Sequence, residues 1–466
     1  MSAAPAFIFR EYDIRGVADH DMPSDVAHDI GRGLGTMLAG VGAKAPRIAV
    51  GRDCRLSSPR LHGALVDGLK QQGVHVVDIG IGPTPLLYFA VHTLGTDGGV
   101  MITGSHNPAE DNGFKVMRGK ASFFGKDIQD LKDLLVRRAF SPERPGSEES
   151  VDLYPAYVNH MKGAFSFGGA QPFRFVVDAG NGSGGPLALE VMRALGLEPD
   201  PLFCEMDGKF PNHHPDPTVP KNLDALIRRV KETGARVGIA YDGDADRLGA
   251  VDQNGDIIWG DRLMILFSRA VLADKPGAAI LGEVKCSQTL FDDITKHGGK
   301  AILWKTGHSL IKTKMKETGA LLAGEMSGHL FFADRYFGYD DAIYGSLRLL
   351  EILSRDRRSL GEMLSDVPKT FATPELRVDC PEAIKFEVVR RVTQHYKAAG
   401  NDVVDIDGAR IQFGTAKAPA WGLVRASNTG AVLVMRFEAG SEAERDRIRK
   451  EVETLVHAER NKLGSA

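Results

Sequence analysis

FRFVVDAGNGSGG, residues Phe173 to Gly185, is the stretch that decides the fold class. A short run of β-branched and aromatic residues leads into a glycine-rich turn, and the chain continues as a plausible helix. Alternation of strand, turn and helix is the sequence pattern of α/β proteins. The same order of strand, turn and helix occurs at three other stretches, which are RIAVGRD (Arg47–Asp53), AAILGEV (Ala278–Val284) and KAILWKTGH (Lys300–His308). We therefore expect an α/β protein, and the likeness of these units hints at a duplicated domain architecture.

Chain length and polar breaks predict how the chain divides. A chain of 466 residues favours about three domains, or four if one is small. SPERPGSEES at 141–150 is the best linker candidate, Asn254-Gly255 between two apolar runs predicts a tight hairpin turn, and a third break is expected near 366–369. The last part is predicted to be a small α+β domain with a helix around 381–398 and another after Gly440. The expected domains are 1–150, 151–256, 257–367 and 368–466.

Composition excludes several classes of protein. Hydrophobic residues make up 43% and charged residues 26% of the chain, which is the balance of a globular protein. A net charge of −3 gives no overall basic field, so nucleic acid and anionic lipid are not expected partners. The four cysteines lie far apart without zinc spacing. Because we also see no signal peptide and no apolar stretch long enough for a membrane, we expect a cytoplasmic protein.

The hexapeptide TGSHNP, Thr103 to Pro108, follows the apolar strand GGVMI. The carboxyl ends of strands are where α/β sheets place their ligands. We expect Gly104 to let the backbone turn sharply and Pro108 to prevent an immediate helix, so that the Ser105 hydroxyl is presented on an exposed loop rather than buried. Taken alone, a Gly-Ser pair in a loop is more often a simple turn.

The heptapeptide YDGDADR, Tyr241 to Arg247, follows a second apolar strand, RVGIA. Asp242, Asp244 and Asp246 alternate at a spacing of two, so a tight loop can direct three carboxylates at one cation, and magnesium is the expected ion. The opening is similar to an EF-hand loop, but the later EF-hand positions do not match. Three carboxylates in five residues repel one another, which favours a bound metal over a solvated acidic turn.

Two further polar loops are weaker signals by themselves. GEMSGH, Gly324 to His329, lies between the apolar runs ALLA and LFFAD, which predicts the tip of a strand-turn-strand unit. RASNTG, Arg425 to Gly430, combines a guanidinium with short polar side chains and suits a phosphate dianion. Either loop alone could be an ordinary turn or an inert piece of surface.

Taken together, the four motifs resemble those of the α-D-phosphohexomutase superfamily, and of its phosphomannomutase/phosphoglucomutase group in particular. They occur in that family's order, one in each of four successive domains, and the resemblance covers essentially the whole chain. The supporting matches are FREYDIRG (Phe9–Gly16), NGFK (Asn112–Lys115), GEVKCS around Lys285 and KTGHS around His308. The resemblance implies three similar α/β domains with mixed sheets and a smaller C-terminal α+β domain, arranged around a central active-site cleft.

The resemblance also implies roles for individual residues. The serine of the first motif carries a phosphoryl group in this family, so Ser105 is expected to be a phosphoserine whose phosphate completes a metal site. The implied metal ligands are Ser105, Asp242, Asp244 and Asp246, and the implied catalytic residues are Ser105, Lys115, Arg247 and His308. The implied sugar contacts are Tyr12, Arg15, Lys285, Glu325, Ser327 and His329. The implied clamp for the phosphate that is not transferred consists of Arg425, Ser427, Asn428 and Thr429.

The implied reaction converts hexose 1-phosphate and hexose 6-phosphate reversibly through an enzyme-bound hexose 1,6-bisphosphate, which must turn around between two transfers. The expected partner is thus a small phosphosugar, and a monomer is expected by analogy. Whether Lys115 or His308 is the proton acceptor stays open, as does the preference between glucose and mannose. Two residues depart from the family pattern: Ala245 stands where glycine is common, and Ala431 where proline is common. Both changes are small and leave the functional side chains intact.

Three alternatives compete with this interpretation. Met326 in GEMSGH resembles the glucose/mannose group, whereas phosphoglucosamine mutases typically carry glutamine there, so phosphoglucosamine mutase is the second candidate. A metal-dependent phosphatase would not need a separate phosphate clamp such as RASNTG. A non-catalytic phosphosugar-binding protein is disfavoured because the serine and all three aspartates are present.

Overall fold

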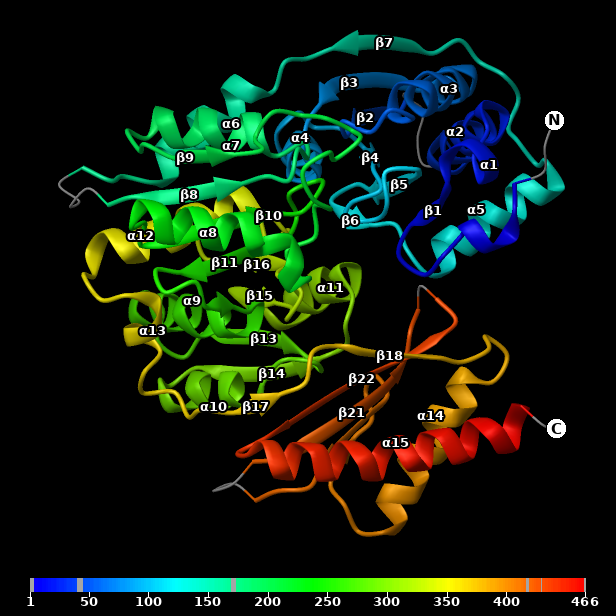
Figure 1. Ribbon diagram of the computed structural model, residues 1–466. Helices are drawn as coiled ribbons and strands as arrows, with labels where there is room; N and C mark the ends of the chain where they lie inside the picture. The colour runs from blue at the N-terminus through cyan, green and yellow to red at the C-terminus, as the bar shows by residue number, and fades with distance from the viewer. Residues whose placement is uncertain (1–3, 40–44, 169–172, 416–418, 429, 465–466) are drawn as a thin grey trace.

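The computed structural model describes residues 4–39, 45–168, 173–415, 419–428 and 430–464 (Figure 1). In these residues the chain forms four β-sheets, and each has its own covering helices (Figure 1). The first three are mixed sheets and the fourth, near the C-terminus, is antiparallel, which confirms the predicted fold class.

The first sheet has the strand order β1-β5-β4-β2-β3-β7, with β6 paired to β5. Its strands are β1 (Ile14–Val17), β2 (Arg47–Arg52), β3 (His75–Ile81), β4 (Gly98–Ile102), β5 (Asp111–Arg118), β6 (Ala121–Ser122) and β7 (Ser147–Ser150). Its helices are α1 (Ala18–Asp21), α2 (Ser24–Ala39), α3 (Ser58–Gln71), α4 (Thr84–Thr93) and α5 (Lys126–Arg137), with a 3-10 turn at Ala6–Ile8. The end of the predicted linker is therefore a strand, because β7 pairs in parallel with β3.

The second sheet has the order β12-β11-β10-β8-β9 and the third β14-β13-β15-β16. The second contains β8 (Phe175–Asp178), β9 (Asp200–Leu202), β10 (Val237–Tyr241), β11 (Leu248–Asp252) and β12 (Ile257–Ile258), with α6 (Tyr154–Ala164), α7 (Gly185–Ala194), α8 (Asp224–Thr233) and a 3-10 turn at Pro220–Leu223. The third contains β13 (Ala279–Glu283), β14 (Lys300–Trp304), β15 (Leu322–Gly324) and β16 (Leu330–Phe332), with α9 (Gly260–Asp274), α10 (Gln288–Lys296), α11 (His308–Thr318), α12 (Ala342–Arg355) and α13 (Leu360–Met363).

The hairpin predicted at Asn254-Gly255 is confirmed, since β11 and β12 pair antiparallel across it. Strand β12 belongs to the second sheet and lies just past the boundary that we proposed at 256.

The C-terminal sheet consists of β17 (Phe371–Ala372), β18 (Leu376–Asp379), β19 (Val403–Val404), β20 (Ala409–Gln412), β21 (Trp421–Ala426) and β22 (Val432–Ala439). Helices α14 (Lys385–Ala398) and α15 (Glu442–Gly464) cover it, and α15 is the long red helix of Figure 1. Both helices were expected from the sequence.

One topological feature recurs in all four sheets and positions the four motifs. Each motif joins a strand to its antiparallel neighbour: β4 to β5, β10 to β11, β15 to β16 and β21 to β22. In the first three sheets the strand before the motif also pairs in parallel with a strand on its other side. The same connection therefore presents a loop at the carboxyl end of a strand in every domain, which supports the predicted duplication of the first three.

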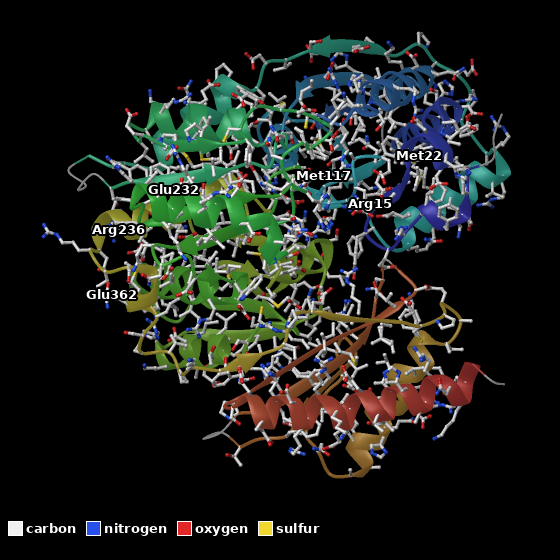
Figure 2. All side chains as sticks on the ribbon, in the orientation of Figure 1. Arg15, Met22, Met117, Glu232, Arg236 and Glu362 are labelled. Carbon is white, nitrogen blue, oxygen red and sulfur yellow. The ribbon has the colours of Figure 1, made fainter. Side chains whose placement is uncertain are left out.

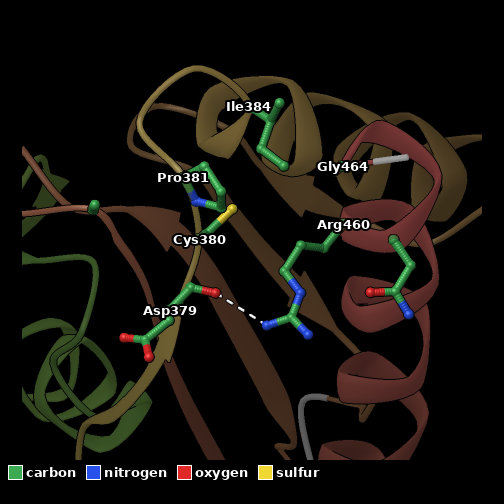
Figure 3. Close-up of a pocket in the computed structure, with 8 residues that line it drawn as sticks. Asp379, Cys380, Pro381, Ile384, Arg460 and Gly464 are labelled. Atoms are coloured by element: carbon green, nitrogen blue, oxygen red, sulfur yellow. Dashed lines mark hydrogen bonds between the residues drawn. The ribbon is translucent and has the colours of Figure 1, made fainter. Parts of the chain in front are cut away.

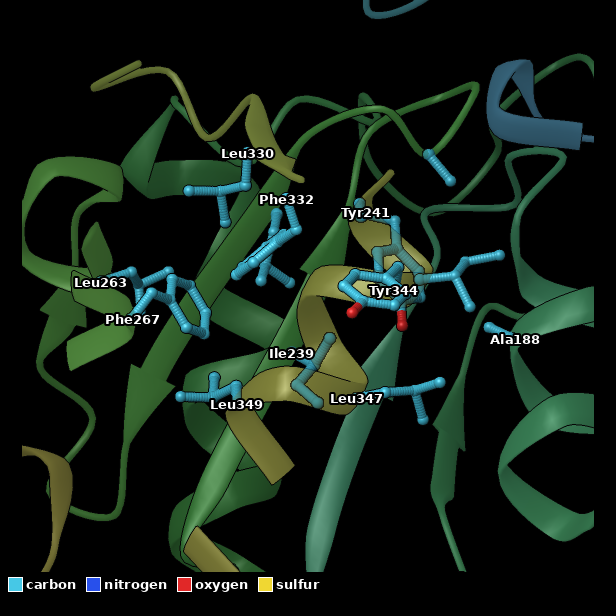
Figure 4. Packing of buried hydrophobic residues seen from close by; sticks show 14 of the residues in the cluster. Ala188, Ile239, Tyr241, Leu263, Phe267, Leu330, Phe332, Tyr344, Leu347 and Leu349 are labelled. Atoms are coloured by element: carbon cyan, nitrogen blue, oxygen red, sulfur yellow. The ribbon is translucent and has the colours of Figure 1, made fainter. Parts of the chain in front are cut away.

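A single apolar core connects the first three domains. Its buried members include Val77 of β3, Ile239 of β10 and Leu322 of β15. Figure 4 shows α12 within it, where Tyr344 and Leu347 lie among side chains of the second and third sheets. The C-terminal domain has a core of its own. Among the described residues, a small cluster of Val284 with Trp421 and Leu423 adds buried apolar contact between it and the third domain.

Among the described residues, no helix combines the length and the apolar character that a membrane crossing requires.

Candidate active site

One cleft of about 1530 Å³ lies between the domains, and residues of all four line it. Figure 2 labels Arg15 on the side of the first domain that faces the C-terminal domain. The predicted site residues on the cleft wall are Tyr12, Arg15, Ser105, Lys115, Arg247, Lys285, His308, Glu325, Ser327, His329, Arg425, Ser427 and Asn428. Asp242, Asp244 and Asp246 are fully buried beside this wall. Thr429 lies outside the described residues.

The loop that carries Ser105 differs from the sequence prediction in one respect. Ser105 is buried, with 1% of its surface exposed, so the prediction of an exposed serine is wrong. The reason is a contact with the second domain, because the Ser105 hydroxyl donates a hydrogen bond of 2.8 Å to Oδ2 of Asp242. Ser105 itself has a left-handed backbone, with φ of 48°, and its amide donates to the hydroxyl of Thr103 at 2.8 Å. The serine is thus held against the acidic loop.

Gly104 is required for a reason other than the predicted turn. A Cβ atom at this position would lie 2.5 Å from Cζ of Arg55, so only glycine leaves room for that guanidinium. Arg55 is buried and donates to the backbone carbonyls of Ser105 and Asn107, both at 2.7 Å. It also donates to the carbonyls of Pro108 and Asp111 and to the Asp53 carboxylate. We did not predict Arg55 from the sequence, although it follows the strand RIAVGRD, whose carboxyl end opens at the same edge of the sheet.

The three aspartates of the second loop have the geometry of a cation site. One carboxylate oxygen of each lies within 4.8 Å of the others. Oδ1 of Asp244 and Oδ1 of Asp246 are buried and have no hydrogen-bond partner. Burial and the two neighbouring carboxylates raise the pKa of Asp242 well above its ordinary value, because the loop holds three carboxylates close together. Hard carboxylate oxygens with unused lone pairs fit a divalent cation such as Mg²⁺.

Lys115 balances two of these aspartates. Its ammonium contacts Oδ2 of Asp244 at 2.7 Å and also pairs with Asp246. Burial opposes the charged form, but the carboxylates outweigh burial and raise the pKa of Lys115, so the lysine stays protonated at neutral pH. The hydroxyl of Thr84 donates to the same oxygen of Asp244 at 2.5 Å.

His329 contacts both the acidic loop and a residue that we did not predict, Asp340. Nε of Arg247 donates to Nε2 of His329 at 3.0 Å, so a neutral His329 carries its proton on Nδ1. That nitrogen lies 3.2 Å from Oδ2 of Asp340. Asp246, His329 and Asp340 could formally hold a metal. However, the Lys312 ammonium, 3.1 Å from Oδ1 of Asp340, already supplies positive charge there.

His308 lies on the same wall. Its Nδ1 is 4.0 Å from the Asp340 carboxylate. Burial and the Lys312 ammonium hold the pKa of His308 well below its ordinary value, so the imidazole is neutral at pH 7. Asp340 stands in the run GYDD, which has no motif character, so the sequence carried no signal for it.

The third loop is the predicted strand-turn-strand tip between β15 and β16. Oε1 of Glu325 accepts from the amide of Gly307 at 2.7 Å, and Oε2 accepts from the Ser327 hydroxyl at 3.1 Å. Glu325 is buried, and burial by itself would raise its pKa, but the Lys285 charge and the Gly307 hydrogen bond outweigh burial and lower it, so Glu325 is ionised. The pair therefore presents hydrogen-bond acceptors to the cleft.

The fourth loop meets the first and third domains across the cleft. Nδ2 of Asn428 donates to the Tyr12 hydroxyl at 2.6 Å, and that hydroxyl donates to the Thr306 carbonyl at 3.1 Å. Nε of Arg425 donates to Oδ2 of Asp407 at 3.1 Å. The same carboxylate oxygen accepts from the amide of Thr306 at 3.0 Å, so Asp407, which we did not predict, joins the two domains.

Lys285 forms a second link to the C-terminal domain. Its ammonium lies 3.1 Å from Oε2 of Glu375, and both side chains line the cleft. The Lys285 charge outweighs burial and lowers the pKa of Glu375 to about 2.

A serine hydroxyl beside three carboxylates, with a cationic polar loop on the wall of the same cleft, is the arrangement of an α/β enzyme of the phosphotransferase class. Family models for the phosphoglucomutase/phosphomannomutase α/β/α domains I, II and III match residues 6–138, 155–255 and 259–371, and the model of the C-terminal domain matches 375–455. The chain therefore belongs to the phosphoglucomutase/phosphomannomutase family and is an isomerase of the phosphohexomutase type.

Individual relatives agree over nearly the full length. The chain is 46% identical to a phosphomannomutase/phosphoglucomutase of Pseudomonas putida, over 96% of this chain and 95% of the relative. It is 43% identical to a phosphoglucomutase of Neisseria gonorrhoeae, with 98% of each chain covered. A crystal structure of a phosphoglucomutase/phosphomannomutase family protein from Burkholderia thailandensis superimposes with a TM-score of 0.89 at 43% identity, and covers 97% of each chain.

Proposed function

We propose that this protein converts hexose 1-phosphate and hexose 6-phosphate reversibly, with Ser105 as the phosphoryl carrier and a hexose 1,6-bisphosphate as the intermediate. The observation that carries this proposal is the contact of the Ser105 hydroxyl with Asp242, on the wall of a cleft that Arg425, Ser427 and Asn428 also line. A carrier and a separate fixed clamp allow either end of a hexose to undergo the same chemistry. The substrate is then a small phosphosugar.

We further propose Mg²⁺ as the resident metal, held by Asp242, Asp244, Asp246 and a phosphate oxygen on Ser105. Bound there, the ion would neutralise charge on the phosphoryl group. The donor set and the two partnerless carboxylate oxygens favour this assignment.

Proton transfer from the attacking sugar hydroxyl is best assigned to a neutral imidazole. Lys115 is a poor base, because its ammonium is bound by two carboxylates. Its role is electrostatic, as is that of Arg247, which faces the same loop. His308 and His329 both line the cleft, and neutral His308 can accept a proton as the new bond forms.

Binding of the sugar follows from the third and fourth loops. Glu325 and Ser327 would accept the 3- and 4-hydroxyls, and Tyr12, Arg15, Lys285 and His329 would complete the pocket. The clamp for the phosphate that is not transferred would be Arg425, Ser427, Asn428 and Thr429. Arg425 must then exchange part of its contact with Asp407 for the phosphate.

For the sugar, we propose glucose and mannose together. The named relatives include phosphomannomutase/phosphoglucomutase and phosphoglucomutase enzymes, and Met326 agrees with that group. The phosphoglucosamine mutase alternative is not favoured. We also propose that the protein acts as a monomer in a reducing cytoplasm, which suits its four free cysteines.

The test is a coupled assay of the purified protein with glucose 1-phosphate, mannose 1-phosphate and glucosamine 1-phosphate, in Mg²⁺ with a trace of the matching 1,6-bisphosphate. We expect turnover of the first two, and a loss of at least about 10³-fold in Ser105→Ala. Thr103→Ser keeps the hydroxyl that supports the loop and is the matched control, with activity expected to stay within about tenfold.

The other outcomes identify the competing functions. Preference for the amino sugar would assign the protein to the phosphoglucosamine mutases. Release of inorganic phosphate without bisphosphate would indicate a phosphatase. Binding without turnover of any sugar would leave a non-catalytic phosphosugar-binding protein.

A further inference from the structure

A buried lysine outside the predicted site lies directly behind the phosphate loop. Lys385 is 2% exposed, and its ammonium donates to the backbone carbonyls of Ser427 at 2.5 Å and Gly430 at 3.1 Å. Its third contact is the carboxylate of Glu382, at 2.7 Å, which is itself largely exposed. The ammonium therefore binds both sides of the loop's tip but does not line the cleft that the loop faces.

The position of Lys385 in its helix is electrostatically unfavourable. It is the first residue of α14, where the helix dipole places partial positive charge and disfavours a cation. Burial of an ammonium is a further cost unless its donors are all used. Contact with two loop carbonyls and one carboxylate offsets both costs, so the location of this lysine is explained by the loop.

Peptide geometry connects these contacts to anion binding. In a trans peptide the carbonyl and the following N–H point in opposite directions. Because the carbonyls of Ser427 and Gly430 point at Lys385, the N–H groups of Asn428 and Ala431 point away from it. Ser427 and Asn428 line the cleft. Lys385 thus orients the Ser427–Asn428 peptide so that its positive end, the Asn428 N–H, is available to a phosphate in the cleft, and adds its own positive charge behind it.

A second contact on this side of the loop comes from the Cys380 amide, which donates to the Ala431 carbonyl at 2.9 Å. A pocket of about 740 Å³ opens beside the loop, with Cys380, Ile384 and Ala431 in its lining (Figure 3). Across that pocket Arg460 of α15 reaches the carbonyl of Asp379 at 3.0 Å rather than the loop (Figure 3). The Lys385 ammonium therefore supports the loop on a side where a pocket lies next to it. Arg55 supports the Ser105 loop in the same manner, through four backbone carbonyls.

We propose that Lys385 is a positioning residue for the phosphate loop, and that it sets the affinity for the phosphosugar phosphate that is not transferred. This inference rests on the proposed function of the loop. Since this phosphate is bound in the ground state and the transition state alike, loss of Lys385 should act mainly on KM.

The experiment compares Lys385→Met with Lys397→Met in the full-length protein. Lys397 lies on the same helix and pairs with Asp405 at 2.6 Å. Lys397→Met therefore removes a lysine ion pair without changing a contact of the phosphate loop. We expect Lys385→Met to raise KM for glucose 1-phosphate about tenfold with kcat within about threefold, while Lys397→Met changes neither. Lys385→Arg, which retains donors and charge, should recover part of the loss.

Binding measured by calorimetry separates this inference from the proposed function. In the Ser105→Ala background, where no phosphoryl transfer is expected, Lys385→Met should raise the Kd for glucose 1-phosphate about tenfold. This result supports the positioning role of Lys385 even if the wild type shows no mutase activity. Equal affinities with and without Lys385 overturn the inference while leaving the mutase intact, and absence of binding to the Ser105→Ala protein overturns both. If Lys385→Met does not fold, Lys385→Gln replaces it under the same criteria.

Discussion

Two parts of the cleft wall are built in different ways. One surrounds Ser105 and is called the Ser105 end, and the other contains Arg425, Ser427 and Asn428 and is called the phosphate-loop end. The Ser105 end belongs to the first three domains, which share one apolar core, and its central contact from Ser105 to Asp242 is buried. The phosphate-loop end belongs to a domain with its own core. Its links to the others are largely polar, such as Asn428 with Tyr12 and Lys285 with Glu375, beside one small apolar cluster.

The difference agrees with what each end has to do. Phosphoryl transfer requires fixed distances between carrier, metal and substrate, and a shared close-packed core provides them. A bisphosphate that turns around needs room, and polar contacts at a domain interface can exchange with water more readily than an apolar core can be opened. We therefore expect the Ser105 end to stay fixed and the phosphate-loop end to open more readily.

The largest effect is expected at the Ser105 end. Asp242→Asn should lower kcat about 10³-fold, because it removes charge from the metal site and weakens the acceptor of the Ser105 hydroxyl. The measurement is the coupled assay at saturating Mg²⁺. Asp256→Asn, in the nearby β11–β12 hairpin but exposed, is the control and should retain activity. Near-normal turnover of Asp242→Asn would contradict the assignment of the acidic loop.

The buried support of the Ser105 loop should appear as stability. Arg55→Met leaves Asp53 buried without its ion-pair partner, together with loop carbonyls that lose their donor. We expect the free energy of unfolding to fall by about 3–5 kcal/mol in urea denaturation. Arg60→Met removes a half-buried arginine that also donates to carbonyls, and should cost about 1 kcal/mol. Equal losses in the two variants would show that the Ser105 loop needs no special support.

The phosphate-loop end should respond to acid. Glu375, with a pKa near 2 in the folded protein and an ordinary value of 4.5, contributes stability that is complete above pH 4.5 and is lost as pH falls toward 2. The contribution is about 1–3 kcal/mol. Melting temperatures from pH 6 to 2.5 should therefore fall more steeply in the wild type than in Glu375→Gln. Parallel curves would mean that the pair with Lys285 does not hold the domains together.

The smallest effect is expected at Ala245 in the acidic loop. Its φ of 53° is left-handed, which costs an alanine about 1–2 kcal/mol. Ala245→Gly relieves this strain. However, glycine has more conformational entropy than alanine in the unfolded chain, which lowers the free energy of unfolding by about 0.4–1 kcal/mol. We expect a net gain in unfolding free energy of between about 0 and 1.6 kcal/mol, with unchanged kcat. A destabilised variant would show that the Ala245 methyl group, which is fully buried, contributes packing that exceeds the strain.

The local sequence was sufficient for the four motifs and for the strands that precede them. Strands β4, β10 and β15 are short apolar runs that end at polar loops, and hydrophobic pattern and turn chemistry are local properties. The resemblance to a known family then supplied the domain count, the mixed sheets and the cleft. The acidic loop could be predicted from its spacing, because alternate aspartates on one tight turn can direct their carboxylates at a common point.

Contacts between distant segments could not be predicted in this way. Burial of Ser105 depends on Asp242, which lies in another domain, and the role of Gly104 depends on Arg55, some fifty residues earlier. Asp340 and Lys385 carry no motif, and their importance follows only from what the fold places beside them. The sequence by itself determined which side chains can perform the chemistry, because that is a property of residue type and spacing. Only the tertiary structure decided which charges are buried, paired and aimed into the cleft, because burial and pairing arise when separate elements pack.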